Sequence, residues 1–208
     1  MICIVNYGMG NLGAIQNMLR KIGAESVVSS NGDDIEKADM IILPGVGAFD
    51  NGMKNLERLN LLDILNAKVI IKKTPVLGIC LGAQLITKRS EEGSLPGLGW
   101  LDAETIRFNF LGDHVNHKIP HMGWNTVTVQ KASHIFNTMD EESRFYFVHS
   151  FHLACNNPKD ILTTTTYGYE FVSSFQKGNI IGVQFHPEKS HKFGMKLLTK
   201  FAGFSHNA

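Results

Sequence analysis

The 208 residues include 20 lysines and arginines against 19 aspartates and glutamates, so the formal net charge is +1 at pH 7. This balance argues against a general nucleic-acid binder or a polybasic membrane protein, because both carry an excess of basic residues. A hydrophobic fraction of 43% with 20 glycines predicts one globular domain over residues 1–208 and excludes a disordered or fibrous chain.

The distribution of apolar residues and cysteines indicates the cellular compartment. No stretch approaches the roughly 20 apolar residues that a membrane helix needs. Residues 1–5 form a strand-like run without a basic segment before it, which argues against a signal peptide. Cys3, Cys80 and Cys155 are odd in number and irregularly spaced, which fits neither a disulfide framework nor a zinc site. We therefore expect a cytoplasmic protein with no metal and no cofactor.

The first half of the chain alternates strand and helix patterns. Helical spacing of apolar residues predicts helices over residues 12–22 and 53–62. Such alternation is typical of βαβ units, with a parallel sheet covered on both faces. The strands of this half are predicted from apolar runs at 2–5, 26–30, 40–43 and 75–79.

The second half has a different pattern. Period-two alternation predicts strands that extend the sheet with antiparallel or mixed pairing, and Phe193, Leu197 and Phe201 predict an amphipathic terminal helix. Together the two halves predict a flavodoxin-like α/β domain with a central, mostly parallel sheet. The strands of this half are predicted at 126–130, 145–148, 161–166, 171–176 and 180–184.

A candidate nucleophile lies between the strand 75–79 and a helix predicted to begin near Leu81. The segment Gly78-Ile79-Cys80-Leu81-Gly82 is the cysteine version of the strand–nucleophile–helix elbow, whose tight turn requires glycine at the flanking positions. The helix N-terminus favours the reactive thiolate, and the amide of Leu81 points to where an oxyanion would develop. The alternative is a small buried cysteine between two packing glycines.

A candidate base follows the strand 180–184. His186 lies just beyond the carboxyl end of this strand, at the edge where α/β sheets form their ligand sites. Glu188, two residues later, is placed to accept a hydrogen bond from the second ring nitrogen of His186. Pro44–Phe49, also directly after a strand, contains Gly45 and Gly47, whose amides suit an oxyanion loop. Alone, His186 is one of nine histidines and the loop an ordinary glycine-rich turn. Combined with Cys80, they favour acyl transfer.

One motif supports a different class of protein. Gly8, Gly10 and Gly13 follow the first strand with GxGxxG spacing, and Asp33 lies twenty residues beyond Gly13. On spacing alone this matches the dinucleotide-binding fingerprint, which makes an NAD-binding oxidoreductase the alternative from another class. That interpretation leaves Cys80, His186 and the loop 44–49 unexplained.

The motifs together resemble the class I, triad-type glutamine amidotransferases. More narrowly, the chain is similar to the glutaminase subunits of imidazole glycerol phosphate synthases. The resemblance extends along nearly the whole chain, and the motifs PHMGWN and YFVHS are its most specific part. Its segments are residues 4–12, 44–49, 78–85, 120–125, 146–150 and 184–190.

This resemblance implies roles for particular residues. Cys80 corresponds to the nucleophile, His186 to the general acid and base, and Glu188 to its orienting partner. The residues that line the glutamine pocket and the oxyanion hole would be Gly45, Val46, Gly47, Leu81, Gln84, His149 and Ser150. The residues that face a partner subunit would be Asn11, Trp124, Tyr146 and Lys189.

The resemblance also implies a partner, and it leaves the ammonia acceptor open. The family's partner is a (β/α)₈-barrel cyclase, which uses the ammonia to make imidazole glycerol phosphate and an aminoimidazole carboxamide ribotide for histidine biosynthesis. Ala83 and Gly13 replace the family's usual methionine and arginine, and residues 87–110 look closer to relatives that supply ammonia for an amidino sugar. The alternative is therefore an amidotransferase subunit of surface-polysaccharide biosynthesis.

Overall fold

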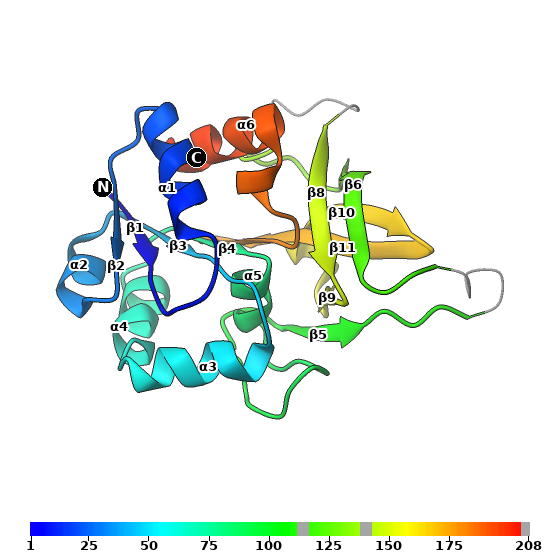
Figure 1. Ribbon diagram of the computed structural model, residues 1–208, viewed down its shortest axis with the longest axis horizontal. Coiled ribbons are helices and arrows are strands. Elements are labelled where there is room, and N and C mark those ends of the chain that lie inside the picture. Colours follow the sequence, from blue (N-terminus) through cyan, green and yellow to red (C-terminus); the bar gives the residue numbers. More distant parts are fainter. Residues whose placement is uncertain (112–116, 138–142, 205–208) are drawn as a thin grey trace.

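A computed structural model describes residues 1–111, 117–137 and 143–204. These residues form a ten-stranded mixed sheet with helices on both faces, and a separate two-stranded sheet lies beside it (Figure 1). Among them, no helix is long and apolar enough to cross a membrane.

The N-terminal half of the sheet is parallel and confirms the predicted flavodoxin-like fold. The spatial order β2-β1-β3-β4-β12 reproduces the flavodoxin arrangement, in which the connections reverse direction between β1 and β3. Ligand sites of such sheets lie beyond the carboxyl ends of the strands, next to that reversal. The five strands are β1 (Ile2–Val5), β2 (Ser26–Ser29), β3 (Met40–Leu43), β4 (Val76–Ile79) and β12 (Ile180–Val183).

Alternation along the buried strands builds two cores. In β1, Ile2 and Ile4 pack into one hydrophobic cluster while Cys3 and Val5 pack into the other. The first cluster is covered by α1 (Leu12–Lys21) and α6 (His191–Ala202), which lie together on one face of the sheet (Figure 1). The opposite face carries α2 (Gly32–Lys37), α3 (Phe49–Arg58), α4 (Leu62–Asn66) and α5 (Leu81–Leu85).

The helix predicted over residues 53–62 is wrong in its extent. The helix α3 ends at Arg58, and α4 begins only at Leu62 before continuing into a π-helical turn at Ala67–Ile71. Asn60 adopts φ 55° between them, a left-handed conformation that stops a helix and that asparagine tolerates well. The apolar spacing continues across this break because both helices bury the same side.

The C-terminal half of the sheet is antiparallel, as predicted, but it contains two strands that the sequence did not reveal. β5 (Ala103–Arg107) pairs along its length with β9 (Phe151–Cys155). The buried positions of β5 are Ala103 and Thr105. Small side chains alternate with large ones along this strand, but hydrophobic side chains do not alternate with polar ones. The predicted strands of this half are β10 (Ile161–Tyr167) and β11 (Tyr169–Lys177), with the short β7 (Thr128–Val129) at the edge.

The two motifs most specific to the family resemblance pair with each other. β6 (His121–Thr126) and β8 (Arg144–His149) form the two-stranded antiparallel sheet, in which His121 lies opposite His149 and Trp124 opposite Tyr146. The strand predicted at 126–130 is therefore divided, because Thr126 ends β6 and only Thr128–Val129 joins the large sheet as β7.

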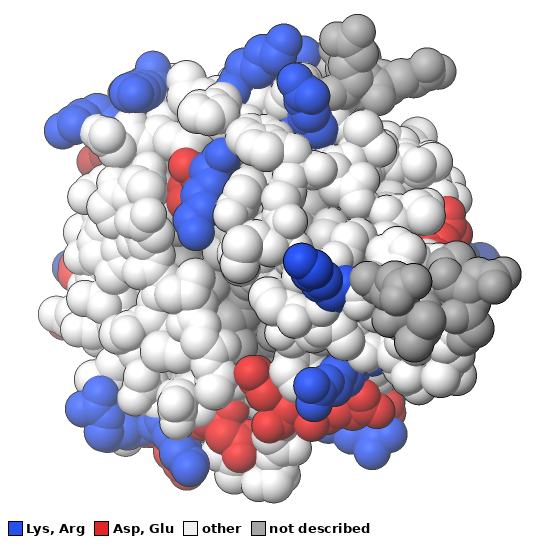
Figure 2. All heavy atoms as spheres, turned by 45° about the vertical axis from the view of Figure 1, so that its right-hand side comes forward, with Lys and Arg blue, Asp and Glu red and all other residues white. Residues whose placement is uncertain are grey.

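Charges of both signs are mixed on the surface. Figure 2 shows acidic side chains gathered along the lower edge of one face, with basic side chains among them. Figure 1 places the segment between α5 and β5 at this edge. Two ion pairs start from this segment, with distances of 2.6 Å from Lys88 to Asp102 and 2.8 Å from Arg89 to the half-buried Glu104 of β5. Ion pairs at the surface contribute about 0–1 kcal/mol each to the free energy of unfolding, so these charges are solvated and add little to stability.

Candidate active site

Cys80 occupies the strained turn that the sequence predicts. It lies between β4 and α5 with φ 51° and ψ −109°, a conformation rare for any residue with a side chain. A Cβ added to Gly82 would lie 1.8 Å from the carbonyl oxygen of Leu43, and one added to Gly78 would lie 2.8 Å from backbone atoms of Ala83. The two glycines are therefore required for the turn, which holds the Cys80 side chain at the carboxyl edge of the sheet.

His186 follows β12, the neighbour of β4 in the sheet, and forms a buried pair with Glu188. The distance from Nδ1 of His186 to Oε1 of Glu188 is 2.7 Å, and the two side chains are 1% and 2% exposed. Nε2 of His186 has no hydrogen-bond partner among the described residues. Burial lowers the pKa of His186, but the charge of Cys80, the hydrogen bond to Glu188 and the charge of Glu188 outweigh burial and raise this pKa to about 10. His186 is therefore suited to hold a proton beside the sulfur of Cys80.

The backbone of His186 is fixed by the two-stranded sheet. The amide of His186 donates to the carbonyl of Tyr146 over 2.9 Å. The hydroxyl of Ser190 donates to the carbonyl of His186 over 2.6 Å and accepts from the amide of Tyr146 over 3.0 Å. β8 thus holds the histidine loop from the side, so the position of His186 depends on the position of β8.

A cavity of about 610 Å³ opens above these side chains. It collects most residues of the predicted glutamine pocket from segments far apart in sequence. Gly45 is the exception, because it lies beneath the cavity floor: a Cβ there would approach Leu81 and Tyr7 to 2.7 and 2.6 Å. The lining comprises Val46, Gly47, Ala48, Cys80, Leu81, Gln84, Glu92, Pro120, Val148, His149, Ser150, Phe151, His186 and Lys189.

The loop 44–49 is anchored at its base and free at its centre. The buried phenol of Tyr7 donates to the carbonyl of Pro44, and burial together with the charge of Cys80 raises the pKa of Tyr7, so the phenol stays a donor. Gly47 adopts φ 114°, where residues with a side chain are strained. Val46 is 41% exposed at the cavity mouth. Gly47 therefore permits backbone conformations that other residues resist, whereas Pro44 is held by Tyr7.

Sequence reasoning missed two polar residues of the site. The carboxylate of Glu92 accepts from the amide of Phe49 over 2.9 Å and lines the cavity. Gln184, fully buried, places Nε2 3.8 Å from Sγ of Cys80. Glu92 lies in a segment without periodic pattern, and nothing local marks it. Gln184 lies two residues before the strand-end histidine, a position that could have suggested it.

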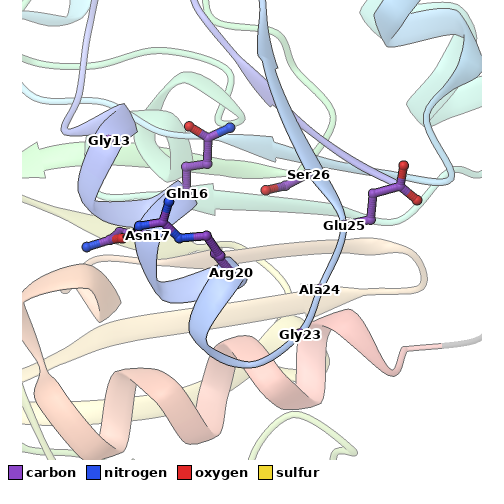
Figure 3. A pocket seen from close by; sticks show the side chains of 8 residues that line it. All are labelled: Gly13, Gln16, Asn17, Arg20, Gly23, Ala24, Glu25 and Ser26. Carbon is purple, nitrogen blue, oxygen red and sulfur yellow. Dashed lines mark hydrogen bonds between the residues drawn. The ribbon is translucent and has the colours of Figure 1, made fainter.

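The GxGxxG segment has a structural use here. A Cβ on Gly10 would lie 3.1 Å from the amide nitrogen of Gly45, so this glycine allows the first turn to approach the loop 44–49. Gly13, which in the dinucleotide fingerprint provides close packing between helix and strand, has nothing within 4 Å of an added Cβ. It lies on an open polar hollow of about 620 Å³ next to Gln16, Asn17 and Arg20 (Figure 3). Asp33 lies in the first turn of α2, where its amide donates to the side chain of the cap Asn31.

The residues predicted to face a partner lie on or near the two-stranded sheet. The indole of Trp124, 44% exposed, stacks on His191 at 5.6 Å and meets the ring of Tyr146 edge-on at 6.1 Å. Nζ of Lys189 lies 5.6 Å above the Tyr146 ring. Asn11 caps α1, which packs against the 3₁₀ turn Pro187–Lys189.

A nucleophile elbow, a buried histidine–carboxylate pair and a glycine-rich loop around one cavity define an acyl-transfer site on an α/β sheet. Within the described residues, no cluster of three or more His, Cys, Asp and Glu side chains is arranged to hold a metal ion. The sequence model for class-I glutamine amidotransferases matches residues 3–203. The chain belongs to this family.

Curated relatives of the chain share one name. Imidazole glycerol phosphate synthase subunit HisH 2 of Methanococcus maripaludis is 54% identical over 97% of this chain and 98% of the relative. The protein of the same name from Pseudomonas aeruginosa is 48% identical over the same shares. HisH 1 of Campylobacter jejuni strain 81-176 is 42% identical over 97% and 99%.

Solved structures confirm the fold. The structure of PurLQS from Thermotoga maritima superposes with a TM-score of 0.73 at 18% identity, covering 97% of both chains. The crystal structure of a putative GMP synthase protein from Thermoplasma acidophilum gives a TM-score of 0.71 at 22% identity, covering 97% of this chain and 92% of that one.

Proposed function

We propose that this chain is the glutaminase subunit of an imidazole glycerol phosphate synthase, hydrolysing L-glutamine and passing ammonia to a synthase partner. The observation that carries the proposal is the pairing of Cys80 in its elbow with the buried His186–Glu188 pair at one cavity. The family model over residues 3–203 and the names of the relatives support it, as they support treating residues 1–208 as one catalytic domain. A free thiol nucleophile suits the reducing cytoplasm.

The reaction proceeds through a thioester. The Cys80 thiolate attacks the side-chain amide carbon of glutamine, and the negative charge moves to the carbonyl oxygen. As the C–N bond breaks, Nε2 of His186 gives its proton to the leaving ammonia. Water then attacks the thioester, and His186 takes a proton from it. The C–S bond breaks, which releases glutamate and restores the thiolate.

Glu188 orients His186 for both steps. The bond to Nδ1 fixes the ring so that Nε2 faces the reacting atoms, and the carboxylate stabilises the imidazolium that exists before ammonia leaves. The unpartnered Nε2 is the nitrogen available for proton transfer.

The oxyanion needs two donors, and the chain offers them from two elements. The amide of Leu81 begins α5, where the helix dipole adds to its effect. The second donor is an amide of Val46–Gly47, delivered by a peptide rotation that Gly47 permits. Partner binding would favour the rotated state, so we expect low activity for the isolated chain.

Recognition of the substrate follows from the charges in the cavity. Free glutamine carries an ammonium and a carboxylate at its α-carbon. Glu92 is the acidic side chain in the cavity lining, so it is suited to receive the ammonium. The remaining polar contacts would come from Gln84, His149 and Ser150.

The partner is a (β/α)₈-barrel cyclase that docks over the cavity mouth. Lys189 both lines the cavity and caps the Tyr146 ring, so the docking surface and the catalytic site are contiguous. Exposed Trp124 borders a hollow of about 530 Å³ that accepts a partner side chain, and Asn11 extends the surface toward α1. Docking at this mouth would pass ammonia onward before water protonates it. The hollow is lined by Trp124, Arg144, His191, Lys192 and Phe193.

A second acceptor remains a candidate. The relatives at 54% and 48% identity carry the number 2 in their names, as expected where one organism holds more than one such subunit. A second subunit can serve a second synthase, and an amidino sugar is the acceptor that the segment 87–110 favours.

Glutamate release from glutamine tests the proposal. The chain is assayed alone and with a cyclase partner plus the partner's ribulosyl substrate. We expect stimulation by the loaded partner and complete loss in Cys80→Ala, while synthesis from added ammonium persists. Cys155→Ala, which removes a thiol outside the cavity, is the matched control. Loss of both activities in Cys80→Ala would make the cysteine structural, and stimulation by a sugar synthase alone would favour the second acceptor.

A further inference from the structure

A continuous row of hydrogen bonds begins at the nucleophile. Nε2 of Gln184 faces Sγ of Cys80 at 3.8 Å, and Oε1 of Gln184 accepts from Nε2 of Gln84 over 3.2 Å. Gln84 also donates to the carbonyl of Phe151 over 3.2 Å. Because Gln84 holds the oxygen of Gln184, the amide of Gln184 is turned with its N–H toward the sulfur, where it stabilises a thiolate.

The row continues through two buried histidines, whose tautomers follow from their partners. The carbonyl of Phe151 can only accept, so Nδ1 of His149 donates to it over 2.7 Å. Nε2 of the neutral His149 ring must then accept, over 3.0 Å, from Nδ1 of His121. The remaining Nε2 of His121 faces the amide of Asn125 at 3.4 Å, and Asn125 also donates to the carbonyl of Thr166 over 2.9 Å.

Burial keeps both histidines in these states. His121 and His149 are 3% and 6% exposed, and burial lowers the pKa of His121 to about 4 and that of His149 well below its usual value. Neutral rings preserve the direction of donation from the surface to Phe151. Reversing a bond on either side of the Phe151 carbonyl would leave two donors or two acceptors face to face. The two sides meet at this carbonyl, which accepts from both Gln84 and His149 and so joins their positions.

The outer end of this row lies on β6, the strand whose opposite face carries Trp124 of the surface that we assign to the partner. Asn125 follows Trp124 in β6, and His121 lies opposite His149 across the β6–β8 pair. A protein that presses on Trp124 therefore displaces the strand that carries Asn125 and His121. The inner end of the row is the sulfur of Cys80.

We propose that His121 and Gln184 are positioning residues, which through His149 and Gln84 connect the β6–β8 surface to the thiol of Cys80. Gln184 supplies the hydrogen bond to sulfur, and His121 fixes the orientation of the residues that hold Gln184. The proposal deepens the proposed function and rests on Cys80 as its nucleophile.

The test measures alkylation of Cys80 by iodoacetamide against pH, by peptide mass mapping of the full chain. Gln184→Met removes the donor at similar volume, and we expect the midpoint of reactivity to rise by about one pH unit. His121→Phe keeps a ring against Tyr167 but removes both nitrogens. We expect a smaller rise in the pH midpoint, seen as about threefold slower alkylation at pH 7. Other titratable groups around the sulfur are the same in every variant: Tyr7, Glu92, His149, His186, Glu188 and Lys189.

His152→Phe is the matched control. His152 is a buried histidine of the same aromatic cluster, but its ring bonds to Leu153 and Tyr169 and is outside the row. We expect wild-type alkylation from this variant. The proposal is overturned by wild-type curves for both Gln184→Met and His121→Phe, or by an equal shift in His152→Phe.

A second variant of His121 keeps the test decisive if His121→Phe does not fold. His121→Asn places an amide N–H near the position of Nδ1, so it should keep the wild-type curve, and a shift like that of Gln184→Met overturns the proposal. Failure of the proposed function is recognised separately. In that case the wild-type chain neither hydrolyses glutamine with its partner nor reacts with a glutamine-like electrophile, whatever the alkylation curves show.

Discussion

Nδ1 of His186 lies 2.7 Å from Oε1 of Glu188, and both side chains are shielded from water. Only one residue, Pro187, separates them, and the turn Pro187–Lys189 brings the carboxylate back to the ring. The geometry leaves Nε2 free toward the cavity, and it makes the carboxylate the group that decides which nitrogen carries the proton.

Glu188→Gln should therefore remove most of the activity without disturbing the fold. The amide can donate to Nδ1, which would stabilise the tautomer with its proton on Nε2 and leave Nε2 without the lone pair that takes a proton from water. We expect glutamine hydrolysis with the loaded partner to fall on the order of 10³-fold. Ammonia-dependent synthesis measured on the same complex should be unchanged, and a drop of less than tenfold would contradict the role of Glu188.

Stability should fall on acidification because buried histidines resist protonation, most clearly His121 and His149. The pKa of His121 is about 4 in the folded chain, against an ordinary value of 6.5, and burial also holds the pKa of His149 well below that ordinary value. Below pH 6.5 the unfolded chain takes up protons that the folded chain does not, so the free energy of unfolding decreases by up to about 1.4 kcal/mol per pH unit for each histidine. His186, whose pKa is raised to about 10, is protonated in both states there and adds nothing.

Urea unfolding at several pH values between 7.5 and 4.5 measures this slope. His121→Phe should lower the slope of unfolding free energy against pH by the contribution of one histidine. His152→Phe should lower this slope too, since burial also lowers the pKa of His152. A stability curve that stays flat below pH 6.5 would mean that these rings become solvated in the folded chain.

Substitution by alanine should change the stability of the fold in opposite directions at Gly82 and Gly13. At Gly82 the methyl group would overlap the carbonyl oxygen of Leu43, which is backbone and unable to move aside, so we expect a loss of about 3 kcal/mol or more. At Gly13, in α1 with open space around it, alanine should stabilise the fold by up to about 1 kcal/mol. Thermal unfolding of the two variants decides this, and equal shifts would rule out the steric argument.

Much of the site could be predicted because its chemistry is tied to short segments. The elbow around Cys80 requires its glycines within two residues, and His186 and Glu188 lie in one turn, so both motifs are local and readable. The parallel pairing of the N-terminal strands follows from the βαβ pattern in the same way.

The remaining parts depend on contacts that no local pattern encodes. Glu92 reaches the cavity because its carboxylate caps the start of α3, 43 residues earlier in the chain. The strand β5 buries Ala103 and Thr105, small or polar residues that give no hydrophobic alternation. The helix break at Asn60 depends on one left-handed residue within a continuous apolar stripe. Tertiary packing decides each of these cases.

Glu92→Gln should raise the KM for glutamine and leave kcat nearly unchanged. The amide keeps an oxygen that can accept from Phe49, so the loop stays in place, but the charge that would balance the substrate ammonium is lost. We expect a 10- to 100-fold higher KM in the partner-stimulated assay. Glu91→Gln is the matched control, since the carboxylate of Glu91 instead accepts from the amide of Arg107. A fall in kcat at constant KM would place Glu92 in the chemistry rather than in binding.

Trp124→Ala should separate partner binding from the chemistry at Cys80. The indole is 44% exposed while held by two ring contacts, the arrangement of an aromatic anchor that awaits a partner. Removing it should weaken the complex about 30-fold, which corresponds to the 2 kcal/mol typical of such anchors, and raise the partner concentration needed for stimulation. Labelling of Cys80 by a glutamine-like electrophile in the isolated chain should change little. Titration of glutamate release with the cyclase gives the apparent Kd; an unchanged Kd would move the docking surface away from β6 and β8.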